Sequence, residues 1–522
     1  MCFTGVNLTK DLGEEWPGNR MACRNADQSL GQTHSSQFPP TQTTKDSNSQ
    51  ESFIMKEEVK EFDCIIVGAG PAGLACLSGI QEPYSLDTGL SAGQLRYVNR
   101  HCTSRCRSVA VIDPHPDWMT GWSKHFANLN IQFLRSPCMA HPDLFDKNAL
   151  LAYAEMHGRQ NELIESGCAD ELLASRTLYE SQVGLWKLPS TSLFADFCKD
   201  MSRRLPHTYV QGEVTDIDRE EDDGPLWEVT MRDGTKIRAA DVILGMGTIG
   251  QPIVPAALAD APNLVQWTSL GNDNNILLKQ PTCRNVLVVG GGLTAVQVVQ
   301  RVVRDNPKAR VTLCCRRPLQ ERHFDLSIDW FNLRTANKCM FDFYHQSEED
   351  RLSTLKDTRD GGSVPGLYMN DLRRMERAGQ VVRVVGNASF LRSSDDKQAT
   401  IVFDGRTVDT FDAVVLACGT KPDCTSNHLC KKLLERWPLK VVDGFPCVSE
   451  DLVWTKNLYV IGSLGSLNIG PDAANLMGIR RGAEIIANAM ECRCWLRQES
   501  VLKNPFCALE ETSSDDSSDD EE

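Results

Sequence analysis

Two glycine-rich segments of the sequence have the composition and spacing of turns that bind phosphate groups. Each begins with an apolar stretch, and they read IIVGAGPAG and VLVVGGGLTAVQ. Their key positions are Gly68, Gly70 and Gly73 in the first and Gly290, Gly292 and Ala295 in the second. The first glycine permits a tight bend, the second lets the backbone approach a pyrophosphate, and the third small residue lets the following helix pack on the strand. Because helix N–H groups favour the phosphate charge, the sequence predicts two dinucleotide-binding sites.

The acid expected after the first turn stands at the end of the apolar stretch SVAVID, as Asp113. A carboxylate at this position can accept hydrogen bonds from a ribose hydroxyl. The spacing from Gly73 to Asp113 is about twice the usual gap of roughly 20 residues, so we interpret residues 81–107 as a polar insertion. Asp113 is therefore the candidate ribose ligand, and an ordinary surface acid is the alternative.

Two arginines stand at the corresponding position after the second turn. The stretch ARVTLCCRR ends in Arg316 and Arg317. A carboxylate there would repel a 2′-phosphate, whereas guanidinium groups can fork onto it, so this site is predicted to prefer NADPH to NADH. Arg316 is the stronger single candidate because it lies nearer the strand. The alternative is that both arginines are solvated charges at a strand end.

Strands and helices should alternate along the chain to position these groups. We expect helices after both glycine turns and near 472–490, and strands or hairpins within 62–67, 108–113, 208–219, 226–247, 285–289, 309–317, 400–420 and 457–465. Such alternation is typical of parallel sheets with crossover helices. The sequence therefore predicts an α/β fold with two Rossmann-like, three-layer ββα domains, the second inserted into the first.

Composition sets limits on the kind of protein. The chain has 522 residues, of which 41% are hydrophobic and 24% charged, as in globular proteins with two or three domains. The net charge is −15, and eight of the negative charges lie in the terminal run EETSSDDSSDDEE. The remainder is only mildly acidic, which argues against nucleic acid as the main partner.

Both ends of the chain have the composition of disordered segments. Residues 1–58 are rich in Ser, Thr, Gln, Asn and Pro, and 508–522 form an acidic tail. The tail serines could be phosphorylated, with a plain solvated tail as the alternative. No apolar run is long enough to span a membrane, and no secretory signal is recognisable, so a cytoplasmic protein with 20 reduced cysteines is expected.

The order of an acid-tipped site and then an arginine-tipped site resembles the FAD- and NADPH-dependent monooxygenases, particularly their lysine and ornithine N-hydroxylase branch. The resemblance covers roughly residues 60–490. Besides the glycine turns it is carried by GWSKHFANLNIQFLRSPCMAHPD (121–143), LWKLPSTSLFADFC (185–198), DAVVLACGTKPD (412–423) and LYVIGSLGSLNIGPDAANLMGIRRGAEII (458–486). It implies an FAD-binding domain in two parts, 59–255 and 411–507, around an NADPH-binding domain at 256–410.

The resemblance also implies which side chains would contact FAD. Along the first site the flavin ring would lie near Trp122, Arg135 and His141, and the backbone of Val214 would contact the adenine, although His141 could equally be structural and Arg135 could equally form a salt bridge. Four residues would close over the isoalloxazine end, namely Gly462, Gly470, Asn475 and Leu476. A helix starting near Pro471 would aim free N–H groups at the flavin and stabilise negative charge on reduction.

The sequence departs from the family pattern in three places. Ser463 follows Gly462 where an aspartate is usual, and Gln266 and Trp267 stand where such enzymes often have a histidine. The substrate-binding residues of ornithine hydroxylases are not recognisable, so the identity of the substrate is not carried over. Neither a dithiol nor a zinc centre is expected, because no C-x-x-C pair occurs and the ten histidines are scattered.

These observations lead to one favoured function and two alternatives. Hydride would pass from NADPH to FAD, and by resemblance the reduced flavin would react with O₂ and oxygenate a small nitrogen- or sulfur-containing substrate. This scheme requires no side-chain nucleophile or general base, and none is assigned. The alternatives are a flavin-binding regulatory protein of the stress-response kind with little turnover, and an NADPH oxidase that releases peroxide. Whether the chain forms a homo-oligomer is left open.

Overall fold

The computed structural model describes residues 59–81, 107–166, 180–219, 226–271, 278, 280, 282–332, 335–358, 361–392 and 397–498, with side chains omitted at 180–182 and 491–498. All of them belong to one unit of the chain, Glu58–Glu522. The predicted disorder of residues 1–58 and of the acidic tail lies outside the described residues, as does nearly all of the predicted insertion. Among the described residues, no helix is both long and apolar enough to cross a membrane.

The first sheet is built around β1 (Lys60–Val67), which pairs in parallel with β2 (Val109–Asp113) and with β8 (Lys236–Leu244). The strand order is β21-β22-β8-β1-β2-β5. The remaining strands are β5 (Thr208–Gln211), β21 (Val453–Thr455), β22 (Leu458–Val460) and the antiparallel β6 (Val214–Asp218) and β7 (Trp227–Met231), of which β7 pairs with β8. The last four residues of β1, Cys64–Val67, are apolar and buried. Such a continuous apolar run is typical of a parallel strand that is covered on both faces.

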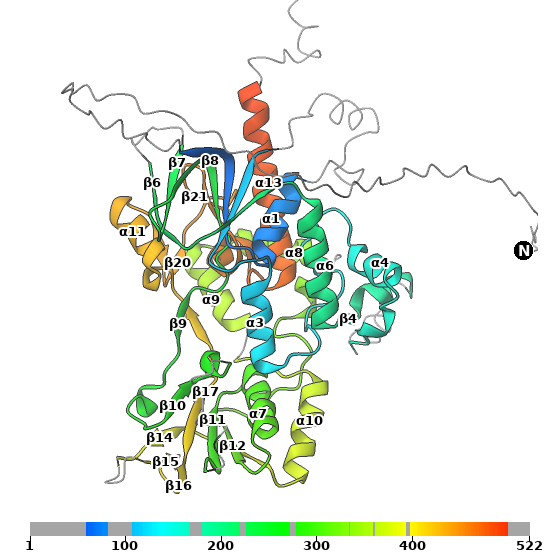
Figure 1. Cartoon of the computed structure of the whole chain (residues 1–522). Coiled ribbons are helices and arrows are strands. Elements are labelled where there is room, and N and C mark those ends of the chain that lie inside the picture. The colour runs from blue at the N-terminus through cyan, green and yellow to red at the C-terminus, as the bar shows by residue number, and fades with distance from the viewer. Residues whose placement is uncertain are drawn as a thin grey trace, which may run out of the picture. The chain divides into compact units, whose positions relative to one another are not determined.

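Helices cover one face of the first sheet (Figure 1). They are α1 (Pro71–Gln81), α3 (Thr120–Leu129), α6 (Thr191–Arg204) and α13 (Leu476–Gln498), and α4 (Ala149–Met156) lies beside α6. Cys64 and Ile66 of β1 pack into the core on this side, while Ile65 and Val67 pack toward β7 and α11 (His428–Arg436) on the other. The alternation of strand side chains thus produces three layers, helix, sheet and β-meander.

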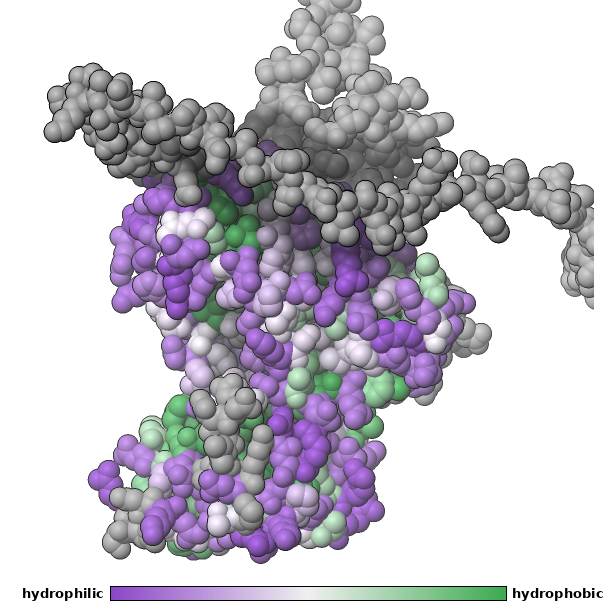
Figure 2. Space-filling model, viewed as in Figure 1, coloured by the Kyte–Doolittle hydropathy of each residue, from purple (hydrophilic) through white to green (hydrophobic). Residues whose placement is uncertain are grey.

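The second sheet repeats this design. Its five parallel strands, in the order β10-β17-β11-β12-β13, are Leu264–Gln266, Ala413–Leu416, Asn285–Val289, Arg310–Cys315 and Val381–Val385. The helices α7 (Leu293–Asp305) and α10 (Gly366–Arg377) cover one face, and an antiparallel sheet covers the other. That antiparallel sheet consists of β14 (Ala388–Phe390), β15 (Ala399–Phe403) and β16 (Thr407–Phe411). In Figure 2 polar side chains cover the outward faces of α7 and α10, whereas apolar surface gathers over β10.

The order of elements along the chain confirms that one α/β unit is inserted into another. All strands of the second sheet lie between β8 and β21 of the first. The chain enters the inserted unit through β9 (Gly250–Pro252) and leaves it through β18 (Thr420–Pro422), and these two strands form a short antiparallel pair. The predicted boundary at 410/411 needs correction, because β17 pairs with β10 and β11 of the second sheet. Strand β17 has the position in the second sheet that β8 has in the first, since each lies next to the strand that precedes a glycine turn.

A fourth apolar cluster joins the two units. Its members come from the first part of the chain, from the inserted part and from the closing part, and include Met139, Trp186, Phe324, Trp330, Phe445 and Leu467. Two helices of the inserted part contribute, α8 (Ala336–Tyr344) and α9 (Glu348–Thr358), and α9 contacts α12 (Ser466–Ile469). The short pairs β3 (Leu163–Ile164) with β4 (Leu188–Pro189), and β19 (Val441–Val442) with β20 (Phe445–Pro446), complete the elements.

Candidate functional site: two dinucleotide-binding turns

The three glycines of the first turn have distinct surroundings. A Cβ atom on Gly68, whose φ is +112°, would lie 2.4 Å from the carbonyl oxygen of Gly245. A Cβ atom on Gly73 would lie 2.0 Å from the carbonyl oxygen of Gly68, whereas one on Gly70 would meet nothing within 4 Å. The outer two positions are therefore closed by the protein itself, and the middle one is open at the start of α1, where a phosphate can approach.

Asp113 is held beside this turn at the end of β2. Its Oδ2 atom accepts a hydrogen bond from the backbone N–H of Ala69 (2.8 Å), and its Oδ1 atom accepts one from His115 (2.9 Å). The backbone N–H of Gly68 also donates to the carbonyl of Ile112 (2.8 Å). The fold thus brings the predicted ribose acid to the predicted pyrophosphate turn, despite the long separation in sequence.

The contrast between Gly70 and Gly73 gives a test of the first turn. We expect Gly70→Ala to fold with an unchanged Tm but to bind FAD about tenfold more weakly, because the methyl group enters only the space left for the ligand. Gly73→Ala should instead destabilise the apo protein by about 1–3 kcal/mol, since its methyl group collides with backbone. Fluorescence titration with FAD and thermal unfolding measure the two effects. Wild-type FAD affinity in Gly70→Ala would show that the ligand does not pass this turn.

The second turn matches the first in geometry. A Cβ atom on Gly290 would lie 2.4 Å from the carbonyl oxygen of Ala417, the counterpart of Gly245. A Cβ atom on Gly292 would meet nothing within 4 Å, and Ala295 is fully buried. The backbone N–H of Gly290 donates to the carbonyl of Cys314 (3.0 Å), as Gly68 does to Ile112. The methyl group of Ala295 would lie 3.0 Å from a Cβ atom on Gly290, so alanine at the packing position also requires glycine at residue 290.

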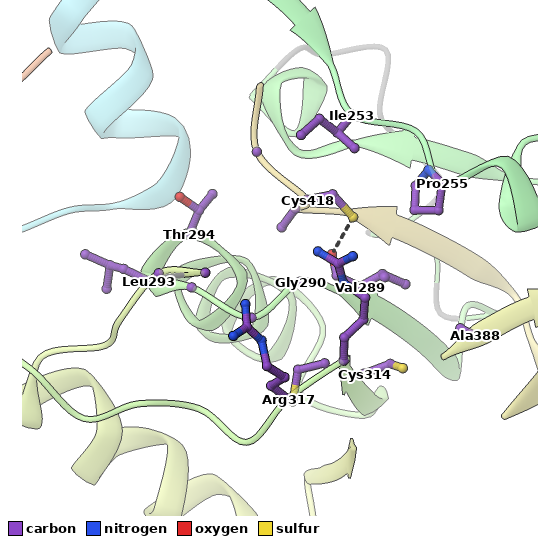
Figure 3. A pocket seen from close by; sticks show the side chains of 18 of the residues that line it. Ile253, Pro255, Val289, Gly290, Leu293, Thr294, Cys314, Arg317, Ala388 and Cys418 are labelled. Atoms are coloured by element: carbon purple, nitrogen blue, oxygen red, sulfur yellow. Dashed lines mark hydrogen bonds between the residues drawn. The ribbon is translucent and has the colours of Figure 1, made fainter. Parts of the chain in front are cut away.

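A cavity of about 820 Å³ surrounds the second turn (Figure 3). Arg316 and Arg317 line it at the end of β12, and both are exposed. The other walls come from residues 253 and 255–258, from 417–419 and from 361–363. The thiol of Cys418 donates to the carbonyl of Val289 (3.5 Å); burial raises the pKa of Cys418, and the charge of Arg316 opposes this rise. The predicted phosphate-binding arginines and the glycine turn therefore share one cavity.

Arg135, for which the resemblance implies a place near the flavin ring, lines the cavity around the second turn. Its Nε atom donates to the carbonyl of His323 (2.5 Å), and its Nη2 atom donates to the Ser363 hydroxyl (2.5 Å). His323 returns a contact through Nε2 to the carbonyl of Arg135 (3.3 Å), and burial lowers the pKa of His323 to about 4. Arg135 thus joins the first part of the chain to the inserted unit at the edge of the cavity.

The other three side chains assigned to the flavin lie within the first unit. Trp122 stacks on Phe126 with ring centroids 3.9 Å apart and packs against the helical core. Val214 is half-buried at the start of β6 and packs against the opposite core. His141 is fully buried with its ring edge toward Phe197, and its Nε2 atom lies 3.3 Å from the carbonyl of Lys147. His141 therefore has the surroundings of a structural side chain.

The buried His141 predicts acid sensitivity. Burial, with a contribution from Arg480, lowers the pKa of His141 to about 3, against about 6.5 in an unfolded chain. As the pH falls between these values the unfolded state takes up the proton first, so the free energy of unfolding should fall by up to about 1.4 kcal/mol per pH unit. Urea unfolding at pH 7 and 5 should show this slope. It should be smaller in His141→Gln and unchanged in His345→Gln, an exposed control; an equal slope in His141→Gln contradicts the assignment.

The closing segment, residues 462–475, is held by an ion pair between buried Asp472 and partly buried Arg481. Gly462 (φ +76°) begins a 3₁₀ turn, Gly462–Gly465, and Gly470 (φ +111°) ends α12 with Trp330 3.1 Å from its Cβ position. Asp472 is fully buried and bonds to Arg481 through both oxygens, at 2.8 and 3.0 Å. Arg481 also donates to the carbonyl of Ile469 (2.9 Å). Arg481 of α13 therefore fixes the segment between α12 and α13.

Two details of this segment differ from expectation. The long helix begins at Leu476, not near Pro471, because the intervening residues form turns in which Ala473 bonds to Gly470 and Asn475 bonds to Asp472. Asn475 directly precedes the helix. Ser463, which replaces the usual aspartate, donates its hydroxyl to the carbonyl of Gly247 (3.0 Å) and is buried.

Several residues that line the cavity around the second turn were not predicted from the sequence. They include Gln320, Asp325, the segment 361–363 and the apolar residues 253 and 255–258. The Gly361-Gly362 pair was the available signal, because adjacent glycines mark backbone with positive φ. Among the described residues no group of three metal-binding side chains occurs, and Cys314, Cys315, Cys418 and Cys424 are free thiols.

We compared the sequence and the fold with those of known proteins. The sequence model of the family L-lysine 6-monooxygenase/L-ornithine 5-monooxygenase matches residues 177–385. The fold matches the ornithine N-hydroxylase KtzI of Kutzneria sp. 744 with a TM-score of 0.60 at 17% identity, over 83% of this chain and 99% of that one. L-lysine 6-monooxygenase of Pseudomonas syringae matches with a TM-score of 0.58 at 19% identity, over 82% and 99%. No similar sequence is found among the curated proteins.

A third solved structure is the cadaverine monooxygenase DfoA of Erwinia amylovora, bound to FAD, with a TM-score of 0.58 at 15% identity over 83% and 94% of the chains. The inserted pair of α/β units thus has the fold of the flavin monooxygenases with two dinucleotide-binding domains. The family match over residues 177–385 and the shared fold agree with the resemblance to the lysine and ornithine N-hydroxylase branch.

Proposed function

We propose that this chain is an FAD-dependent oxidoreductase that takes hydride from NADPH and, with O₂, oxygenates a small substrate through a nucleophilic nitrogen or sulfur atom. One observation carries the proposal. Two glycine turns of matching geometry lie in the two α/β units of the chain, and the strands that follow them end in opposite charges, Asp113 and Arg316 with Arg317. The related enzymes are described as acting on ornithine, lysine and cadaverine, which favours an amine as the substrate class.

The residues of the first site fit FAD. The open side at Gly70 leaves room for a pyrophosphate at the start of α1, and the fixed carboxylate of Asp113 can accept bonds from a ribose. The closing segment would cover the flavin end through Gly462, Gly470, Asn475 and Leu476. In this assignment Trp122 would lie near the flavin ring and the backbone of Val214 near the adenine, while their side chains pack the two faces of the sheet that carries the turn.

The residues of the second site fit NADPH. Gly290 and Ala295 close the turn and Gly292 leaves it open, at the edge of a cavity whose volume suits a dinucleotide. Arg316 and Arg317 supply cations for a 2′-phosphate. The preference for NADPH over NADH therefore follows from the charge at the end of β12.

FAD, when bound, supplies two-electron chemistry and reactivity with O₂, and NADPH supplies the hydride. The chain's own residues orient these groups and keep water out. Arg135 holds the inserted unit against the first part of the chain, and the aromatic cluster around Trp186, Phe324 and Trp330 fills the junction between them. Apolar side chains at such a junction would exclude water from the space between the two proposed sites.

Steady-state assays in air test this function. FAD-loaded protein should consume NADPH faster when a suitable amine or thiol is added, and should form oxygenated product in proportion. Release of one peroxide per NADPH with every compound tested would identify an NADPH oxidase instead. Failure of the FAD-loaded protein to consume NADPH at all would contradict the proposal and favour the regulatory alternative.

A further inference from the structure

A short segment packs against the second glycine turn and is not part of the glycine motif. We call residues 361–363 the strap. Gly361 and Gly362 have φ values of +77° and +90°, and a Cβ atom on Gly362 would lie 3.4 Å from the Cα atom of Gly292. The buried hydroxyl of Ser363 donates to the carbonyl of Phe324 (2.9 Å) and accepts from Arg135. The Ser363 end of the strap is thus fixed by hydrogen bonds next to the cavity.

Gly361 makes room for the guanidinium group of Arg317. The three heavy atoms nearest to its Cβ position all belong to that side chain: Nη2 at 2.7 Å, Cζ at 3.4 Å and Nε at 3.8 Å. Real Cβ atoms do not approach a neighbour as closely as 2.7 Å, so any side chain here must displace the guanidinium. Because Arg317 is long and flexible, its head can move at little cost to folding.

We infer that Gly361 is a specificity-determining residue for the dinucleotide. Without a Cβ atom, it lets Arg317 hold its guanidinium over the strap, at the wall of the cavity that also contains the glycine turn. The inference rests on the proposed function, in which Arg317 meets the 2′-phosphate of NADPH. A side chain at residue 361 therefore lowers the affinity for NADP⁺ and NADPH, which carry the 2′-phosphate, and leaves the affinity for NAD⁺ and NADH unchanged.

Gly361→Ala tests this against a matched control, Gly379→Ala. Gly379 follows α10 with φ +71°, close to the value at Gly361, but its Cβ position meets nothing within 4 Å. Both variants carry the same backbone strain, and only one displaces Arg317. Calorimetric titration of the FAD-loaded protein should show that Gly361→Ala binds NADP⁺ about tenfold more weakly and NAD⁺ equally well. Gly379→Ala should bind both as the wild type does.

Arg317→Ala and the double variant separate the possible failures. If Gly361 acts through Arg317, adding Gly361→Ala to Arg317→Ala causes no further loss of NADP⁺ affinity. Equal NADP⁺ affinity in Gly361→Ala and Gly379→Ala, or additive losses in the double variant, would overturn the inference alone. If Arg316→Ala and Arg317→Ala also leave NADP⁺ affinity unchanged, the NADPH site itself is wrong. Should the alanine variants fold poorly, Gly361→Asn and Gly379→Asn test the same contrast, since asparagine tolerates positive φ.

Discussion

Replacing Arg481 by methionine is expected to lower the free energy of unfolding by about 3 kcal/mol, one of the two largest effects that the structure predicts. The guanidinium of Arg481 is the cation bonded to Asp472, which is fully buried, and it also bonds the carbonyl of Ile469. Removing it leaves the carboxylate buried without its cation and frees the closing segment between α12 and α13. Urea unfolding of the variant and the wild type measures the loss.

Two companion variants identify the cause of this loss. Asp472→Asn combined with Arg481→Met should recover part of the stability, because the remaining buried charge is then gone. Arg480→Met is the positional control: Arg480 is also buried, but it donates to the carbonyls of His141, Asp143 and Leu144, away from the closing segment. We expect it to destabilise the fold without weakening FAD binding in the protein that folds. A loss below about 1 kcal/mol in Arg481→Met would contradict a structural role for the ion pair.

Replacing Arg316 by alanine is expected to weaken NADPH binding about 10- to 100-fold and to leave NADH binding nearly unchanged. A hydrogen bond to a charged group contributes about 1.5–3 kcal/mol, and each 1.4 kcal/mol corresponds to about a tenfold change in affinity. Arg316 lies at the end of β12 on the cavity wall and is exposed, so its removal should not disturb the core. Titrations with NADPH and NADH provide the comparison.

A charge-matched control makes the arginine test specific. Arg304 lies on α7 of the same unit, is 43% exposed and does not line the cavity. Arg304→Ala changes the net charge by the same amount and should leave both dinucleotide affinities unchanged. Equal losses for NADPH and NADH in Arg316→Ala would show that the arginine does not recognise the 2′-phosphate.

The elements that depend on local patterns were predicted well from the sequence. An apolar run followed by a glycine turn gave β1 with α1 and β11 with α7, and small residues at fixed spacing identified both turns. Asp113, Arg316 and Arg317 could be found because each ends an apolar strand next to a turn, and the geometry of parallel sheets brings such ends together.

The features that were missed depend on contacts between distant residues. The strap comes near Gly292 and Arg317 only in the folded chain, and nothing in its local sequence names these partners. The hydrogen bonds of Arg135 could not be predicted, because its partners His323 and Ser363 lie 188 and 228 residues further along the chain. The start of the last helix was misplaced for the same reason, since the turn before it is held by Arg481 from within the helix.

The central claim is that one chain holds both an electron acceptor and its reductant. An anaerobic titration with NADPH tests it most directly: the purified, FAD-loaded protein is followed by flavin absorbance under nitrogen. We predict complete bleaching with about one NADPH per flavin, and much slower bleaching with NADH at the same concentration. Protein that binds no FAD, or bound FAD that NADPH cannot reduce, would contradict the account.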